Sequence, residues 1–260
     1  MMVDVTQVEV VVAHSERATL RVGDVFLKVD SDQTRIDIEV EAIAMAPIPT
    51  PQVLWHRPPA LALAAVEGTA LDRLGEPSAE ASGSSAVAAA SAPAAWAAAG
   101  AAVRMLHDAP LPTWPSRSLD ALESRLDSEC AWLLANDVLP TDVIRRNRQV
   151  AEAALRPWQP VFIHGDLQAA HVFVDADEVT GVIDWSEAGR GDALFDLALL
   201  TLRHTERLSD VIAGYGADVD LGVIRAWWSL RSLLVVRWLT EHGFDPSAPG
   251  YEIDVLRSQM

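Results

Sequence analysis

Residues 164–198 constrain the fold and chemistry of this chain more than any other segment, because they combine apolar, strand-like runs with many histidines and aspartates. The segment contains HGDLQAAHVFVD and then GVIDWSEAGRGDALFDLA. A buried charge without a partner costs several kcal/mol, so these side chains must be paired or must bind something. We expect two short hairpin strands whose ends and connecting loop bring together His164, Asp166, His171 and Asp184.

Two kinds of chemistry fit these four side chains. In the first, Asp166 accepts a proton from a hydroxyl group, while His171 and Asp184 hold a divalent metal ion that bridges phosphates. In the second, all four side chains bind a transition metal such as zinc, which activates a water molecule. Residues of these types also stabilise turns and strand ends without catalytic roles, so the residues alone leave all three interpretations open.

The charge of the chain limits the classes of partner. The chain has 37 acidic and 20 basic residues, and its formal net charge is −17. An acidic protein repels the phosphate backbone of nucleic acids and anionic membrane surfaces, so we expect neither as a partner. A small cationic molecule is the favoured class, and we expect a monomer or a homodimer.

The composition also predicts a folded, cytoplasmic protein. Half of the residues are hydrophobic, which argues against disorder. The single cysteine, Cys130, cannot form a disulfide within the chain, and MMVDVTQVEV lacks the features of a signal peptide. The late apolar run AWWSLRSLLVVRWL is interrupted by Arg231 and Arg237, which favours a buried or amphipathic helix over a membrane span.

The first 68 residues predict a small antiparallel lobe. QVEVVV, ATLRV and VFLKVD are typical strands, and Gly23–Asp24 forms a typical hairpin turn between the last two. TRIDIEVEAIAMA has apolar residues at near-helical spacing, which predicts a helix. The proline-rich PIPTPQVLW favours an extended path into a further strand, and PPALALAAVEG predicts the strand that ends at Gly68. The expected order over residues 1–68 is therefore three strands, one helix and two strands.

Residues 69–260 predict a larger, mainly helical lobe with one short β insertion. The Ser- and Ala-rich residues 77–93 are expected to form a mobile loop or linker. Helices are predicted over AAWAAAGAAVRMLHDAPLP, SLDALESRLDSECAWLLAND and TDVIRRNRQVAEAALRP, and the last two begin with typical capping residues. A helical tail follows the β insertion and ends near residue 242. The predicted fold class is α+β, with two lobes.

Residues 162–198 resemble the aminoglycoside phosphotransferase family and its choline-kinase-like relatives. The usual pattern of that family is His-Gly-Asp-Leu, an asparagine five residues after the aspartate, Ile-Asp-Trp or Ile-Asp-Phe, Gly-Asp-Pro and Asp-Leu-Ala. The resemblance implies a bilobal protein-kinase-like fold, with residues 1–68 as the nucleotide-binding lobe. It also implies an ATP-dependent transfer of phosphate to an alcohol group, with ATP and Mg²⁺ as cofactors and GTP or Mn²⁺ as alternatives.

The resemblance assigns roles to individual residues. Asp166 would orient and deprotonate the acceptor hydroxyl, and Asp184 would bind Mg²⁺ between the β- and γ-phosphates. Lys28 would contact the α- and β-phosphates and pair with a carboxylate on the following helix, for which Glu39 fits the helical pattern best and Glu41 is the alternative.

Further residues are expected to shape or support the site. The strand before Gly68 would end in a hinge whose backbone faces the adenine, around Ala64 to Val66. Support of the catalytic loop is expected from His164 and Asp196, and packing roles are expected for His107, Trp227 and Trp228. Three residues that follow Asp184 are candidates for acceptor binding or, equally, for capping the turn that they form. They are Glu187, Arg190 and Asp192.

Two departures from the family pattern stand out. His171 occupies the position of the usual asparagine, and imidazole is a softer ligand that prefers zinc, copper or nickel to magnesium. His171 would therefore bind Mg²⁺ or Mn²⁺ directly, act through a water molecule, or hydrogen-bond the catalytic loop. The expected nucleotide loop, AHSERAT, contains no glycine.

The sequence thus predicts a small-molecule kinase, with an aminoglycoside antibiotic as the leading acceptor and antibiotic resistance as the corresponding role. A metabolite kinase acting on choline, homoserine or a sugar is the second interpretation. A nucleotide-binding pseudokinase would bind ATP without turnover, and a metallohydrolase would need zinc and be indifferent to ATP.

Overall fold

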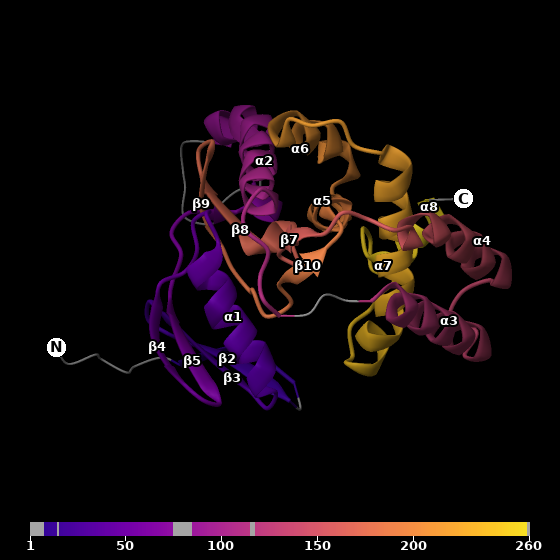
Figure 1. Cartoon of the computed structure of the whole chain (residues 1–260), viewed down its shortest axis with the longest axis horizontal. Coiled ribbons are helices and arrows are strands. Elements are labelled where there is room, and N and C mark those ends of the chain that lie inside the picture. Colours follow the sequence, from indigo (N-terminus) through magenta and orange to yellow (C-terminus); the bar gives the residue numbers. More distant parts are fainter. Residues whose placement is uncertain (1–7, 15, 75–84, 115–117, 259–260) are drawn as a thin grey trace.

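The computed structural model describes residues 8–14, 16–74, 85–114 and 118–258. These residues form a small lobe built on a β-sheet and a larger, mainly helical lobe (Figure 1). The predicted α+β class with two lobes is confirmed.

The small lobe is a five-stranded antiparallel sheet in the order β1-β2-β3-β5-β4. Gly23 adopts a positive φ of 61° in the turn between β2 and β3, as the predicted hairpin requires. All five strands fall where the sequence predicts them. The strands are β1 (Val8–Ala13), β2 (Arg17–Val22), β3 (Val25–Asp30), β4 (Val53–Arg57) and β5 (Ala60–Ala64).

The predicted helix of the small lobe is α1 (Gln33–Met45), which follows β3 directly. Its N-cap is Asp32, whose side chain accepts a hydrogen bond from the backbone N–H of Thr34. Ile36 packs with sheet residues in a small apolar core, and Glu39 one turn later is also buried. The helical period therefore places a carboxylate on the face that covers the sheet.

The first helix of the large lobe differs from the sequence prediction. Residues 77–84 lie outside the described residues, but residues 85–93 are part of α2 (Ser85–His107) rather than a loop. Alanine has the highest helix propensity, and it outweighs the Ser residues and Pro93, which suggested a loop. Pro93 lies inside the helix and is exposed.

The β insertion of the large lobe consists of two small antiparallel units. β6 (Thr69–Ala70), β8 (Val172–Asp175) and β9 (Glu178–Val182) form one sheet, in the order β6-β8-β9. β7 (Val161–Ile163) pairs with β10 (Gly189–Gly191), a strand that the sequence analysis did not predict. β6 pairs with β8 and not with the first five strands, so the small sheet ends before residue 69.

The remaining helices surround this insertion and the long central helix α7 (Figure 1). A continuous apolar core runs through α2, α3, α5 and α7, in which Trp185, Phe162 and Leu126 are fully buried. No described helix combines the length and apolar character that a membrane crossing requires. These helices are α3 (Leu119–Ala135), α4 (Thr141–Ala151), α5 (Ala193–Thr201), α6 (Leu208–Tyr215), α7 (Leu221–Glu241) and α8 (Glu252–Ser258), the last of which was not predicted.

Candidate active site

The His-Gly-Asp segment turns sharply at the end of β7. Gly165 has a φ of 83°, and a Cβ atom built there would lie 2.0 Å from the backbone oxygen of Glu187. Only glycine fits such a position, because both the backbone conformation and the space exclude a side chain. The turn therefore brings Asp166 out of β7 toward the space between the lobes.

The carboxylate of Asp196 holds the backbone of this turn in place. It lies in the first turn of α5, is fully buried, and accepts hydrogen bonds from the backbone N–H groups of His164 (2.7 Å) and Gly165 (3.0 Å). His107 Nε2 lies 3.3 Å from the same carboxylate, and Nδ1 lies 3.1 Å from the hydroxyl of Tyr215. A carboxylate only accepts, so Nε2 carries the proton toward Asp196. This geometry matches the supporting role expected for Asp196 and the packing role expected for His107.

His164 is committed to the same framework. Its ring is fully buried, Nε2 donates to the carbonyl oxygen of Ile183 at 3.0 Å, and Nδ1 accepts from the backbone N–H of Asp166 at 3.3 Å. Burial lowers the pKa of His164, which keeps the ring neutral as this pattern requires. Both nitrogens are used, so His164 has no lone pair for a metal, and the four-ligand zinc interpretation loses one of its ligands.

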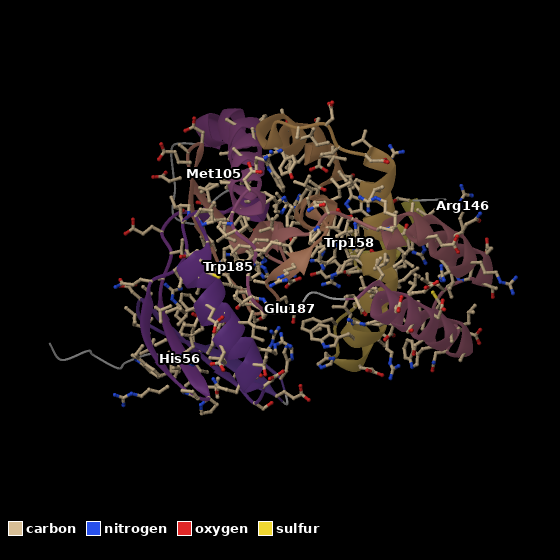
Figure 2. The ribbon with its side chains drawn as sticks, in the orientation of Figure 1. His56, Met105, Arg146, Trp158, Trp185 and Glu187 are labelled. Carbon is tan, nitrogen blue, oxygen red and sulfur yellow. The ribbon has the colours of Figure 1, made fainter. Side chains whose placement is uncertain are left out.

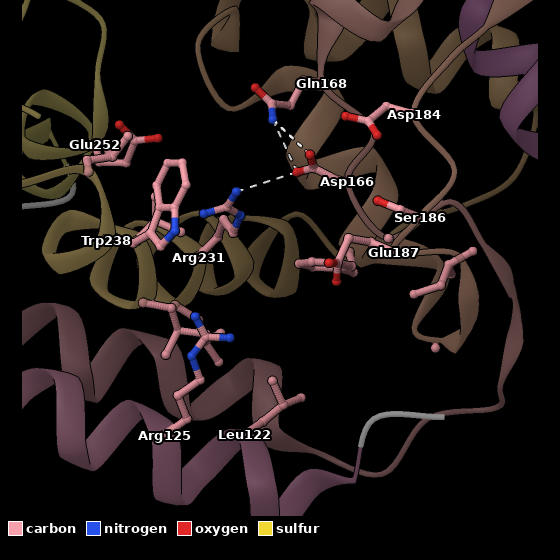
Figure 3. A pocket seen from close by; sticks show the side chains of 18 of the residues that line it. Leu122, Arg125, Asp166, Gln168, Asp184, Ser186, Glu187, Arg231, Trp238 and Glu252 are labelled. Atoms are coloured by element: carbon pink, nitrogen blue, oxygen red, sulfur yellow. Dashed lines mark hydrogen bonds and ion pairs between the residues drawn. The ribbon is translucent and has the colours of Figure 1, made fainter. Parts of the chain in front are cut away.

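Asp166 sits on the floor of the space between the lobes with its carboxylate held by two side chains (Figure 3). Gln168 donates from Nε2 to both carboxylate oxygens at 3.1 Å. One guanidinium nitrogen of Arg231, on α7, lies 3.5 Å from Oδ1. These contacts fix the direction of the carboxylate in advance.

Asp166, His171 and Asp184 form a group suited to a metal ion, since one ligand atom of each lies within 4.8 Å of the others. His171 Nδ1 is 2.8 Å from the backbone oxygen of Asp166, and a carbonyl only accepts, so Nδ1 donates. In the neutral ring, Nε2 then presents its lone pair 3.9 Å from Oδ2 of Asp184. Two carboxylates and an imidazole nitrogen at this spacing fit a divalent cation.

Lys28 joins the small lobe to this group. Its Nζ lies 2.6 Å from Oε1 of Glu39 and 2.9 Å from Oδ1 of Asp184. Burial would lower the pKa of Lys28, but Asp184 and Glu39 outweigh it and raise that pKa, so the amine stays charged. The predicted Lys28–Glu39 pair is therefore present, whereas Glu41 is exposed.

The surrounding cations keep both aspartates of the site ionised. Burial alone would raise the pKa of Asp184, but Lys28 and His171 outweigh it and hold that pKa far below its usual range. Burial acts in the same direction on Asp166, and the neighbouring His171 and Arg231 outweigh it and lower the pKa of Asp166 below its usual value. Carboxylates that stay charged are the form that binds a cation or accepts a proton.

Asp166 and Asp184 line a cavity of about 770 Å³ that extends from the small lobe to α3 and α7. Figure 3 shows Asp166, Asp184 and Glu187 on one side, with Arg231 and Trp238 on α7 and Arg125 on α3 opposite them. Cavities that bind small molecules measure about 300–1,000 Å³, and this cavity falls within that range. The carboxylates and the cations therefore meet where a small molecule fits.

The acceptor candidates after Asp184 differ in how many of their polar atoms are already bonded within the protein. Asp192 lines the cavity, but its buried carboxylate caps α5 and bonds Arg156 at 2.7 Å and Trp227 Nε1 at 2.8 Å. Arg190 donates from Nε to the backbone oxygen of Pro112 at 2.6 Å. Asp192 therefore caps a helix, whereas Arg190 also lines the cavity, and acceptor binding by either residue stays a prediction.

Glu187 bridges the two lobes. Its carboxylate lies 3.0 Å from a guanidinium nitrogen of Arg35 on α1, and its side chain faces the cavity (Figures 2 and 3).

Trp227 and Trp228 are buried in α7, as expected from core packing. Ala64 ends β5, and the side chain of Val66 lies over Gly181 of β9, where a Cβ atom would meet it at 2.4 Å. Neither Ala64 nor Val66 lines the cavity, so their role beside an adenine stays a prediction.

Three residues of the site were not singled out from the sequence. Gln168 follows Asp166 by two residues and shares its turn. Arg231 lies between the buried residues Leu230 and Ser232 of α7, and an arginine in such surroundings signals a functional position. Arg17 lies opposite Asp30 in the sheet register, just as Thr19 lies opposite Lys28. Arg17 and Lys28 therefore share a face of the sheet.

The comparisons with known proteins agree with this geometry. The chain matches the model of the Phosphotransferase enzyme family over residues 8–231. Among solved structures, it is similar to aminoglycoside phosphotransferase APH(3'')-Id from Streptomyces rimosus, with 26% identity and a TM-score of 0.61 over 86% of this chain and 91% of that one. The complex of that enzyme with ADP and streptomycin aligns at 27% identity and the same TM-score, over 84% and 90% of the two chains.

Two more distant structures share the fold. A choline/ethanolamine kinase family protein from Mesorhizobium loti has 18% identity and a TM-score of 0.67, over 98% of this chain and 86% of that one. The GDP complex of aminoglycoside 2'-phosphotransferase-IIIa has 16% identity and a TM-score of 0.70, over 99% and 93%. The chain belongs to the phosphotransferase enzyme family and is a small-molecule phosphotransferase of the protein-kinase-like fold.

Proposed function

We propose that this protein transfers the γ-phosphate of ATP to a hydroxyl group of a small molecule that binds in the cavity between the lobes. The observation that carries the proposal is the convergence of Lys28 from the small lobe with Asp166, His171 and Asp184 from the large lobe. Phosphoryl transfer needs a fixed cation for the phosphates, ligands for a divalent metal, and a carboxylate at the attacking hydroxyl. Asp166 and Asp184 line one end of the cavity, and Lys28 contacts Asp184 from the small lobe.

Asp166 is the residue that handles the proton. Its carboxylate hydrogen-bonds the acceptor hydroxyl and takes its proton as that oxygen bonds to the γ-phosphorus and the bond to the leaving phosphate oxygen breaks. Gln168 and Arg231 hold the carboxylate in one orientation beforehand, which reduces the entropy lost on reaching the reactive geometry.

Asp184 and His171 are the proposed ligands of the metal ion, and Mg²⁺ would supply positive charge between the β- and γ-phosphates there. Nδ1 of His171 is held by the loop carbonyl of Asp166, which points Nε2 toward Asp184. Position 171 therefore acts both as a metal ligand and as a brace for the turn that carries the catalytic aspartate.

Arg17 supplies a second cation for the phosphates. It lines the cavity at the start of β2, and its side chain forms no hydrogen bond or ion pair with any described residue. Asp30, which lies opposite it, is bound instead by Arg35 at 3.5 Å. A guanidinium on the same face as Lys28 offers the phosphates donors that a glycine-rich loop would otherwise provide through its backbone.

Residues 1–68 are proposed to bind the nucleotide, with its adenine beside Ala64 and Val66 at the end of β5. Residues 69–260 then provide the catalytic loop and the acceptor site. The similar structures hold ADP and GDP, which supports binding of a nucleoside phosphate and leaves GTP as the alternative to ATP.

Two acceptor classes head the list of candidates. The net charge favours an aminoglycoside, and the complex of the Streptomyces rimosus enzyme with streptomycin supports testing that class first. A metabolite such as choline, homoserine or a sugar is the second class, and the similarity to a choline/ethanolamine kinase family protein favours including it.

The test is acceptor-dependent release of ADP from purified protein with Mg-ATP, measured across both classes and other hydroxylated molecules. At least one acceptor is expected to raise ADP release well above the rate without acceptor, and mass spectrometry should show one added phosphate. ATP binding without turnover on any acceptor would instead identify a pseudokinase, and failure to bind a nucleotide would contradict the proposed function altogether.

A further inference from the structure

The cavity does not hold the negative charge of the chain. Its lining contains eight carboxylates and six arginines, which leaves a formal charge of −2, whereas the whole chain carries −17. The excess of acidic residues therefore lies almost entirely outside the cavity. A polycationic ligand gains its affinity from unpaired carboxylates around it, so the charge of the whole chain is a poor guide to this site.

The carboxylates that face the acceptor side are already paired. Asp166 is held by Gln168 and Arg231, and Glu187 by Arg35. Each of these contacts neutralises or occupies an oxygen that an amino group of a ligand would need. Binding a polycation here would require breaking ion pairs that the protein itself provides.

Asp192 and Glu252, the other two carboxylates considered for acceptor binding, are also paired with cations of the protein. Asp192 is bound by Arg156 and Trp227. Glu252 is buried and lies 3.2 Å from Arg203, and its second oxygen has no partner among the described residues. That oxygen can accept one hydrogen bond from a ligand hydroxyl, but the charge of Glu252 is balanced by Arg203.

Two guanidinium groups, by contrast, have donors to spare. Arg231 lies beside Asp166, and its NH1 nitrogen is buried without a hydrogen-bond partner. Arg125 lines the cavity from α3 and forms no hydrogen bond or ion pair with any described residue. The side chain of Arg231 is 21% exposed and Arg125 is exposed, so both guanidinium groups can be reached from the cavity, where an oxyanion on the ligand would pair with them.

The wall between these arginines is aromatic, and Trp238 packs there with His242 and His14, whose ring centroids lie 4.2 Å and 5.5 Å from its own. Trp238 projects from α7 beside Arg231, and Leu122 lies one turn before Arg125 on α3 (Figure 3). Trp238 is 38% exposed, which is unusual for so large an apolar side chain. Phe244 stacks on Trp238 with ring centroids 5.8 Å apart, so the wall continues beyond α7.

We propose that the acceptor is an amphipathic hydroxylated molecule with an oxyanion such as a carboxylate, which Arg125 and Arg231 bind while its apolar body lies against Trp238. This inference rests on the proposed phosphotransferase function and replaces the cationic class that the net charge favoured. Planar guanidinium groups bind carboxylates through paired hydrogen bonds, and an aromatic wall buries an apolar body.

The experiment uses three probes of suitable size with the full chain. Cholate has an apolar steroid body, several hydroxyl groups and one carboxylate. The primary amide of cholate keeps the same body and hydroxyl groups and lacks only the negative charge. Kanamycin is a hydroxylated polycation. Each is titrated calorimetrically with the nucleotide analogue AMP-PNP and Mg²⁺ present, and again without them. Cholate is expected to bind at least tenfold more tightly than its amide, and kanamycin more weakly than either.

A matched pair of variants assigns the effect to the cavity. Arg125→Gln should weaken cholate binding at least fivefold and change binding of the amide less than twofold. Arg146→Gln removes the same charge from an exposed position on α4, far from the cavity, and should leave both unchanged (Figure 2). Neither position is part of the core, so both variants should fold.

Three results would overturn the proposal: tighter binding of kanamycin than of cholate, equal binding or no binding of cholate and its amide, or an Arg125→Gln variant that binds cholate like the parent. The titration of AMP-PNP is read separately. Its failure would contradict the phosphotransferase function, while the titrations without nucleotide would still decide whether the cavity binds an oxyanion.

Discussion

Replacing Asp196 should destabilise the chain more than replacing almost any other aspartate. Its fully buried carboxylate accepts hydrogen bonds from the backbone N–H groups of His164 and Gly165 and faces Nε2 of His107. Asp196→Ala leaves two buried backbone donors without partners, at about 1–3 kcal/mol each, and also removes the partner of His107. We therefore expect a loss of about 4 kcal/mol from the free energy of unfolding.

Asp196→Asn should cost about half as much, because the amide keeps one acceptor oxygen for the two backbone donors. Both losses are measured by urea denaturation, followed by tryptophan fluorescence. Asp218, which is exposed and bonded to no described residue, provides the control, and Asp218→Ala should change the free energy by less than about 0.5 kcal/mol.

The kinetic behaviour separates support from catalysis. Asp196→Asn should lower kcat because the turn that positions Asp166 relaxes, while a nucleotide still binds. If Asp196→Ala were no more destabilising than Asp218→Ala, the carboxylate would not be holding the backbone of the turn, and this account of the loop would be wrong.

Three further predictions follow from the same contacts. Gly165→Ala should abolish most activity and lower the melting temperature, because the new Cβ would lie 2.0 Å from the backbone oxygen of Glu187, and a normal melting temperature would refute this. Glu39→Gln should weaken nucleotide binding by roughly tenfold in calorimetry, because Lys28 loses one of the two carboxylates that hold it, whereas an unchanged affinity would show that Asp184 alone suffices. Burial raises the pKa of Cys130 to about 11, so its alkylation by iodoacetamide at pH 8 should be about two orders of magnitude slower than in the urea-unfolded chain, and similar rates would contradict the packing of α3.

Local patterns were sufficient to predict the small lobe. Its strands are short runs rich in strand-forming residues, and Gly23 marks the turn between β2 and β3. The helix after β3 has apolar residues at helical spacing, so each of these elements is determined by its own residues. The family resemblance implied a carboxylate partner for Lys28, and the same helical period favoured Glu39 over Glu41 as that partner. The family pattern then placed Asp166 and Asp184, whose convergence depends on the whole fold.

Other features depend on contacts that no local pattern records. β10 is a three-residue segment that becomes a strand only by pairing with β7, and a Cβ atom at Gly191 would displace the end of the Ile163 side chain, which it would meet at 2.4 Å. Asp192 resembles a free acidic residue in the sequence, yet Arg156 and Trp227 arrive from distant segments to bind it. Net charge misleads about the acceptor for the same reason, because composition does not tell which charges share a cavity.

The substitution Asp166→Asn tests the central claim most directly. Once an acceptor is identified, transfer of labelled γ-phosphate to it is measured for the parent, for Asp166→Asn and for the exposed control Asp175→Asn. Removing the proton acceptor should lower kcat by about 10³-fold while the affinity for AMP-PNP stays within about twofold. An Asp166→Asn variant that transfers phosphate at a rate similar to the parent would contradict the assignment of Asp166 as the catalytic base.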